Sequence, residues 1–268
     1  MTTKTAPKGL TFTHNGHRYK LDGLPVTGVT TLIGGGVPKP ALVYWAARTV
    51  AEYVEANPLD VEALRNDPEK DLVRELAKLP NQKRDEAGIR GTAVHALAES
   101  LIHGGEVEAP EDIAPYVEGY AAFLDAWQIT PLLTERPCAN RTDWWAGTFD
   151  LFATSPFLAD GKPIQIDLKT SNGVYGETAL QTAAYAKADF YLDADGNEQP
   201  LPEIAATFVA HVTADGTVLY QLAADREQID QHYQMFLAAA YTHKTAKLRD
   251  AIITEPLTIP TQEMSQAS

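Results

Sequence analysis

The segment from residue 164 to residue 169, Ile-Gln-Ile-Asp-Leu-Lys, alternates strictly between apolar and polar side chains. This period of two predicts a β-strand, in which successive side chains point to opposite faces of a sheet. Asp167 and Lys169 therefore share one face, about 7 Å apart along the strand. A carboxylate can hold a hard cation such as Mg²⁺, and a nearby ammonium can stabilise charge that develops on a phosphate. An exposed ion pair would look the same, so the pattern indicates catalysis only together with other residues.

Helical and strand-like segments alternate along the rest of the chain. We expect a hairpin over residues 10–21 around Asn15-Gly16, helices over residues 41–55, 91–103, 111–127, 176–192 and 225–249, and strands over residues 132–137, 144–153, 204–212 and 217–222. The glycine run at residues 34–36 lacks the Gly-Lys-Ser/Thr ending of a phosphate-binding loop and predicts a flexible turn. This order predicts an α/β fold with a mixed central β-sheet flanked by helices.

The predicted elements divide the chain into a core and additions at both ends. We expect a hairpin and helical extension over residues 1–87, the α/β core over residues 88–222, and a C-terminal helix packing on the core over residues 223–253. Residues 254–268 form a loose polar stretch, which predicts a flexible tail.

Composition restricts the possible functions. The net charge is −14, which by itself argues against nucleic-acid binding, because phosphate groups favour a basic surface. The single cysteine, Cys138, excludes a multi-cysteine zinc or iron–sulfur site within the chain. The sequence has no apolar run of about 18 residues and no apolar leader, which indicates a cytoplasmic protein without a membrane partner.

Other residues carry candidate chemistry outside the first strand. Asp150 lies among apolar neighbours, where a carboxylate needs a partner or a metal ion. His95 and Glu99 are one helical turn apart, so both can face one cation. Gln181 and Tyr185 have the same spacing on a later helix and can hydrogen-bond to water or phosphate. Each residue taken alone also fits an ordinary structural role.

Four motifs occur in a fixed order: Gly-Thr-Ala-Val-His at 91–95, Gly-Thr-Phe-Asp at 147–150, Ile-Asp-Leu-Lys-Thr at 166–170 and Gln-Thr-Ala-Ala-Tyr at 181–185. Their combination resembles the RecB-like branch of the PD-(D/E)XK nuclease superfamily, which includes phage and CRISPR-associated exonucleases. The resemblance covers roughly residues 88–222. It implies a restriction-endonuclease-like core and a DNA exonuclease that uses Mg²⁺ or Mn²⁺. Several relatives hold an iron–sulfur cluster with cysteines that this chain lacks, so no cluster is expected here.

The resemblance also implies roles for individual residues. The implied metal ligands are His95, Asp150, Asp167 and the backbone carbonyl of Leu168. The implied catalytic residues are Asp150, Asp167, Lys169, Gln181 and Tyr185. Glu99 matches a position where related nucleases carry an acid, and Glu135 is a further acidic candidate.

DNA is the partner that the resemblance implies, together with a recombination or replication protein, in phage recombination, replication or DNA degradation. The candidate DNA contacts are Lys83, Arg84, Arg90, Trp144 and Trp145. The basic residues fit a solvated helix face equally well, and the tryptophans fit a core. Two alternatives stay open: a catalytically silent DNA-end-binding or assembly subunit of the same fold, and an unrelated α/β enzyme acting on small metabolites, which would suit the acidic composition.

Overall fold

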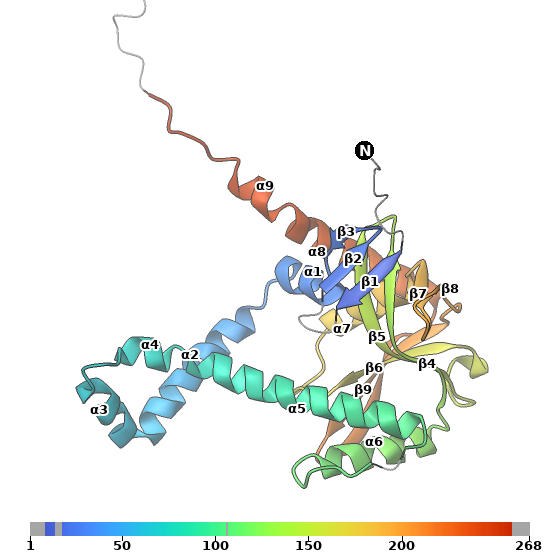
Figure 1. Cartoon of the computed structure of the whole chain (residues 1–268), viewed down its shortest axis with the longest axis horizontal. Coiled ribbons are helices and arrows are strands. Elements are labelled where there is room, and N and C mark those ends of the chain that lie inside the picture. The colour runs from blue at the N-terminus through green and yellow to red at the C-terminus, as the bar shows by residue number, and fades with distance from the viewer. Residues whose placement is uncertain (1–8, 14–17, 106, 259–268) are drawn as a thin grey trace, which may run out of the picture.

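A mixed seven-stranded sheet forms the centre of the molecule, with strand order β10-β9-β6-β5-β4-β7-β8 (Figure 1). The computed structural model describes residues 9–13, 18–105 and 107–258. Within the sheet, β6 (Ile164–Lys169) and β9 (Ala206–Thr213) run parallel, and the other neighbouring strands are antiparallel. The predicted α/β class with a mixed central sheet is therefore confirmed.

The predicted strands all form, with small changes at their ends. The observed strands are β4 (Thr130–Asn140), β5 (Trp145–Thr154), β6, β9 and β10 (Gly216–Ala223), with the short 3-10 turn η1 (Ala159–Gly161) between β5 and β6. The helix predicted over residues 176–192 is too long. It ends as α7 (Glu177–Ala186), and β7 (Phe190–Leu192) and β8 (Glu198–Pro200) follow, because β7 pairs with β4 and buries Phe190 and Leu192.

Helices cover both faces of the sheet. On one face, α5 (Leu79–Ile102) and α6 (Ala114–Ala126) pack against the apolar side of β6, where Ile164, Ile166 and Leu168 are buried. On the other face, α1 (Val29–Gly36), α7 and α8 (Arg226–Lys244) enclose the aromatic residues of β5. Because its side chains alternate, β6 contributes its apolar residues to the core under α5 and α6 and directs its polar residues toward the α7 side of the sheet.

The N-terminal residues divide between the core and a projecting arm. A three-stranded sheet of β1 (Leu10–Thr13), β2 (Arg18–Leu21) and β3 (Leu24–Val26) packs on β4 and β5. β1 and β2 pair as the predicted hairpin, whose Asn15-Gly16 turn lies outside the described residues. The arm consists of α2 (Pro40–Ala56), α3 (Pro58–Asn66), α4 (Leu72–Leu76) and the first half of α5 (Figure 1). The predicted core boundary at residue 87/88 thus falls inside α5.

The glycine run at residues 34–36 is part of helix α1 and not the flexible turn that the sequence predicted. A Cβ atom on Gly36 would lie 2.0 Å from the backbone oxygen of Ala239 in α8, and one on Gly35 would overlap the His243 ring. The glycines therefore allow α1 and α8 to approach closely. The predicted long final helix is interrupted at Thr245, after which α9 (Ala246–Asp250) follows. Of the tail predicted over residues 254–268, residues 254–258 form no helix or strand, and the remainder lies outside the described residues.

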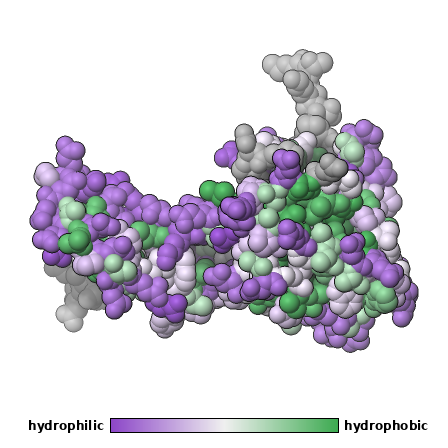
Figure 2. All heavy atoms as spheres, turned by 90° about the horizontal axis from the view of Figure 1, so that it is seen from below, coloured by the Kyte–Doolittle hydropathy of each residue, from purple (hydrophilic) through white to green (hydrophobic). Residues whose placement is uncertain are grey.

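The arm and the core differ in their surfaces. Figure 2 shows mostly hydrophilic side chains over the arm, and a hollow between the tip of the arm and the core. Within the described ranges, no helix combines the length and the apolar character that crossing a lipid bilayer requires.

Candidate active site

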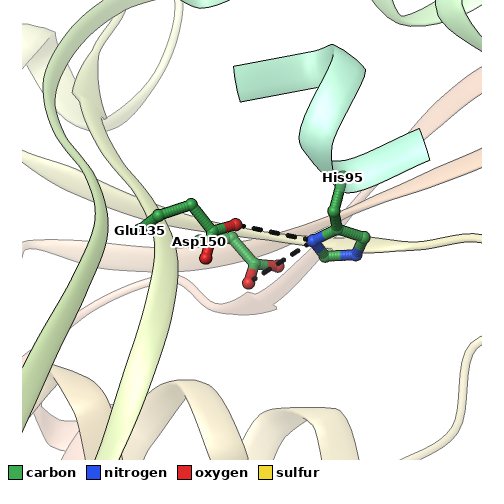
Figure 3. A group of neighbouring side chains, drawn as sticks. All are labelled: His95, Glu135 and Asp150. Atoms are coloured by element: carbon green, nitrogen blue, oxygen red, sulfur yellow. Dashed lines mark ion pairs between the residues drawn. The ribbon is translucent and has the colours of Figure 1, made fainter. Parts of the chain in front are cut away.

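Side chains from α5, β4 and β5 converge at one place (Figure 3). His95 Nδ1 lies 3.6 Å from Glu135 Oε1 and 3.8 Å from Asp150 Oδ1. One potential ligand atom from each of the three residues lies within 4.8 Å of the other two. The other ring nitrogen of His95, Nε2, lies 3.1 Å from the carbonyl oxygen of Leu168. Two carboxylates and an imidazole converge here as a donor set that suits Mg²⁺ or Mn²⁺, while the Leu168 carbonyl meets the other ring nitrogen of His95.

An irregularity in β5 brings Asp150 to this place. In a regular strand, Phe149 and Phe152 would point to opposite faces. Instead their rings stack on one face, 3.9 Å apart between centroids, while Leu151 packs on the other face with α5 and α6. The alternation breaks at Asp150, whose Oδ2 accepts the backbone N–H of Leu168 at 2.7 Å. Asp150 thereby connects β5 with β6.

Glu135 reaches the site through an unusual backbone conformation in β4. Its neighbours Thr134 and Arg136 pair with Leu151 and Phe149, so Glu135 lies across from Asp150. Its φ of 46° falls in the left-handed region, which residues with a Cβ atom rarely adopt. Strain of this kind concentrates at functional sites, where the surrounding structure maintains it.

A second group of side chains lies on the α7 side of β6. Lys169 Nζ lies 2.8 Å from Asp167 Oδ2 and donates to Gln181 Oε1 at 3.3 Å. Asp167 exposes only 1% of its surface, and its Oδ1 has no hydrogen-bond partner among the described residues. The structure therefore joins Asp167, Lys169 and Gln181, as the sequence predicted, and leaves one buried carboxylate oxygen free to accept a ligand.

The electrostatics of the two aspartates favour a bound cation. Burial raises the pKa of Asp150 despite the nearby His95, and burial raises the pKa of Asp167 to about 6 against the opposing effect of Lys169. Asp150 further raises the pKa of Asp167, and Glu135 further raises the pKa of Asp150, because like charges repel. A divalent ion would satisfy both charges, so the residues fit such a group.

The two basic groups of the site are held in their charged forms by the same carboxylates. Burial alone would lower the pKa of His95, but Asp150 and Glu135 outweigh it and raise that pKa to about 9. Burial likewise opposes the charge of Lys169, whereas Asp167 and Asp150 raise its pKa. Protonated His95 and Lys169 side chains therefore balance the carboxylates.

A small cavity lies beside the cluster. It is lined by His95, Glu99, Tyr120, Glu135 and Asp150, among others, and has a volume of about 10 Å³. This volume holds roughly one water molecule or ion. Glu99 borders this cavity but does not belong to the group of three converging ligand atoms. Glu135, and not Glu99, is therefore the glutamate that joins His95 and Asp150 as a potential metal ligand.

Tyr185, for which the resemblance implies a catalytic role, is buried in the core cluster with the aromatic residues of β5. It exposes 3% of its surface and lies against β5, where a Cβ atom on Gly147 would come within 2.4 Å of its ring. The glycine of the Gly-Thr-Phe-Asp motif thus makes room for the tyrosine of the Gln-Thr-Ala-Ala-Tyr motif. Burial raises the pKa of the Tyr185 hydroxyl well above its usual value.

The predicted DNA contacts differ in their positions. Trp145 is wholly buried and donates from its indole nitrogen to Tyr233 Oη at 3.0 Å, so the predicted DNA contact is wrong for this residue. Its place in β5 directs it into the core beneath α8. Trp144 is partly exposed and packs against the small N-terminal sheet, where its indole nitrogen donates to the Pro25 carbonyl at 3.3 Å.

The basic candidates lie along α5. Lys83 and Arg84 are exposed on the arm, about 18 Å from His95 along the helix axis. Arg84 is paired with Asp85 at 2.8 Å. Arg90 is partly buried, and its Nε has no hydrogen-bond partner among the described residues. Its neighbour Gly91 packs on Thr170 just after β6, so Arg90 lies at the edge of the site.

Sequence reasoning undervalued Glu135, for which β4 offered no motif. The only signal is an acid on the strand neighbouring the one that carries Asp150, and its convergence depends on the left-handed backbone.

Comparison of the chain with models of known protein families and with curated proteins finds no match.

Proposed function

We propose that this protein is a divalent-metal-dependent deoxyribonuclease that removes nucleotides from DNA ends. One observation carries the proposal: the buried Asp167, which pairs with Lys169, has no hydrogen-bond partner for Oδ1 among the described residues and lies near a second, largely buried aspartate, Asp150. Two buried carboxylates of raised pKa next to an ammonium are suited to a cation on one side and a phosphate on the other.

The residues that would hold the cation are His95, Glu135 and Asp150, whose ligand atoms converge, and the resemblance adds Asp167 and the Leu168 carbonyl, which lie outside that group of three. When bound, Mg²⁺ or Mn²⁺ would lower the pKa of a water and offset negative charge on the scissile phosphate. Asp150 has a further role, because its hydrogen bond to the Leu168 N–H keeps that peptide in a fixed orientation. The Leu168 carbonyl then faces His95.

In this proposal, Lys169 is a positively charged hydrogen-bond donor that stabilises developing negative charge. The neighbouring carboxylates raise its pKa, so the side chain remains an ammonium and is unsuited to act as a base. Gln181 Oε1 and Asp167 Oδ2 hold Nζ from two sides, which orients the remaining N–H group. That group can donate to the attacking water or to a phosphate oxygen as charge develops there.

Two alternatives make different use of the same residues. A silent DNA-end-binding subunit would not need a lysine held by the buried Asp167 and by Gln181 beside a group of converging metal-ligand atoms. A metabolite enzyme would need a pocket of about 300–1,000 Å³ beside the site. The cavity there measures about 10 Å³. A larger one of about 250 Å³ lies elsewhere, and its Lys187 and Arg226 are already paired with Asp230 and Glu203.

End-directed cutting and the biological setting rest on the resemblance to RecB-like exonucleases. On that basis we place the enzyme in the cytoplasm, which is the host cytoplasm for a phage-encoded chain. Its setting would be recombination, replication or DNA degradation, with a protein of those pathways as a partner.

The test uses end-labelled linear DNA and closed circular DNA with Mg²⁺, Mn²⁺ or EDTA. We expect linear DNA to be degraded only with metal, and the circle to survive. Asp167→Asn and Lys169→Ala should lower the rate at least 100-fold, in the range expected for the loss of a charge-stabilising group. Lys187→Ala is a matched control, because Lys187 also pairs with an aspartate and its side chain is 28% exposed, against 29% for Lys169.

The outcomes separate the candidate functions. Activity retained in a well-folded Lys169→Ala protein would exclude this mechanism. Binding of DNA ends without cleavage under every metal condition would favour the silent subunit. Rapid cutting of the closed circle would retain the metal chemistry and exclude end-directed action.

A further inference from the structure

An exposed aromatic ring lies in the loop that connects the two halves of the Lys169 site. Residues 170–176 join β6, which carries Lys169, to α7, which carries Gln181. The contact of 3.3 Å between Lys169 Nζ and Gln181 Oε1 brings the two ends of this connection together. Tyr175 lies midway between Lys169 and Gln181 in the sequence, and its side chain is 61% exposed. The ring is therefore exposed on a short loop whose two flanking elements carry the interacting Lys169 and Gln181.

The loop that carries Tyr175 is held in place at several points. His211 Nε2, on the strand next to β6, donates to the Ser171 carbonyl at 2.7 Å, and Ser171 Oγ donates to the Gly173 carbonyl at 2.8 Å. At the other end, Glu177 pairs with Lys39 at 3.4 Å. The loop backbone is thus restrained while the aromatic ring remains accessible.

The charge of the protein limits how it can hold DNA. Affinity that depends on phosphate contacts requires many basic groups, and this chain carries a net charge of −14. Stacking of a base on an aromatic ring does not require a positive surface and tolerates any sequence, because every base has a π-face. A duplex keeps its bases stacked on one another, so only an unpaired base can use such a ring.

We propose that Tyr175 stacks on an unpaired base next to the scissile phosphate, and that the preferred substrate is therefore a single-stranded DNA end. The inference rests on the proposed nuclease function and narrows its substrate class. It makes Tyr175 a substrate-binding residue, whereas His211 acts as a positioning residue through Ser171.

Binding without metal tests the contact separately from catalysis. Fluorescein-labelled single strands, blunt duplexes and duplexes with overhangs are titrated in EDTA and followed by anisotropy. Tyr175→Ala should weaken binding of single strands and overhangs about 5- to 150-fold, the range expected for the loss of one stacked base. Binding of blunt duplexes should stay the same, and Tyr175→Phe should bind like the parent. Tyr241→Ala is the matched control, because Tyr241 is 71% exposed on α8.

An abasic series identifies the stacked base. One base at a time is removed near the end of the single strand. At one position, removing the base should weaken binding to the parent protein by the same factor as Tyr175→Ala weakens binding of the intact strand. Removing that base should not weaken binding to the Tyr175→Ala variant any further, because both changes remove the same interaction. Equal affinity of Tyr175→Ala and the parent for single strands, or a variant as sensitive as the parent at every abasic position, would overturn the inference.

Cleavage assays with Mn²⁺ keep the two proposals apart. If the parent degrades DNA and Tyr175→Ala degrades single strands equally well, the nuclease stands and the stacking contact is refuted. If no protein cleaves DNA but Tyr175-dependent binding of single strands persists, the contact stands and the nuclease is refuted.

Discussion

The carboxylate of Asp150 accepts the backbone N–H of Leu168 at 2.7 Å, in the gap where β5 and β6 cease to pair. One aspartate thus serves as a potential metal ligand and as the partner of a strand peptide. The two functions can be separated by substitution. Asp150→Asn keeps an acceptor for the N–H and removes the charge, whereas Asp150→Ala removes both.

In EDTA we expect Asp150→Asn to be more stable than Asp150→Ala by about 1–2 kcal/mol, because alanine leaves a buried donor unpaired. Urea denaturation measures the difference. Both variants should be inactive as nucleases. An alanine variant as stable as the asparagine variant would mean that water satisfies the Leu168 N–H.

At position 135, a glycine variant should be more stable than an alanine variant, which reverses the usual order of stability. Both substitutions remove the carboxylate, so they differ only in the backbone at φ 46°. Glycine adopts this conformation without strain, and we expect Glu135→Gly to be about 1 kcal/mol more stable than Glu135→Ala. The comparison requires only unfolding curves in EDTA. Thr134→Gly against Thr134→Ala at the preceding position, where φ is not positive, should show the ordinary order with alanine more stable.

Metal binding should stabilise the folded protein. A ligand that binds only the native state at a hundredfold excess over its Kd adds about 2.7 kcal/mol to the free energy of unfolding. We expect Mn²⁺ to raise the Tm of the parent relative to EDTA, and the rise to disappear in the Asp150→Asn/Asp167→Asn double variant. Asp230→Asn, which removes the partner of Lys187, is the control and should keep the rise. A shift retained in the double variant would place the cation at another site.

The basic residues of α5 should determine the salt dependence of DNA binding. If Lys83, Arg84 and Arg90 each contact one phosphate of a single strand, their joint replacement by glutamine lowers the slope of log affinity against log salt by about 2. A control triple variant removes the same charge from exposed positions outside α5, by replacing Lys162, Lys247 and Arg249 with glutamine. Equal slopes in the two triple variants would exclude the arm as the DNA-binding surface.

Local sequence patterns determined most of the central strands and their flanking helices, and much of one half of the site. The alternation of β6 assigned Asp167 and Lys169 to one face, and the helical spacing set Gln181 on a later helix, where it meets Lys169. Such inferences succeed because side-chain direction along one element depends only on its backbone period. The same patterns did not extend to β7, which becomes a strand because it pairs with the distant β4.

Tertiary structure decided how the other half of the site is assembled. Glu135 joins His95 and Asp150 only because β4 takes a left-handed turn and β5 loses its alternation at the same level, and neither irregularity has a signature in the sequence. The glycines at 35 and 36 are needed because α8 crosses them, and Trp145 is buried because that helix covers it. Convergence, close approach and burial are properties of contacts between segments far apart in the chain, so local sequence cannot specify them.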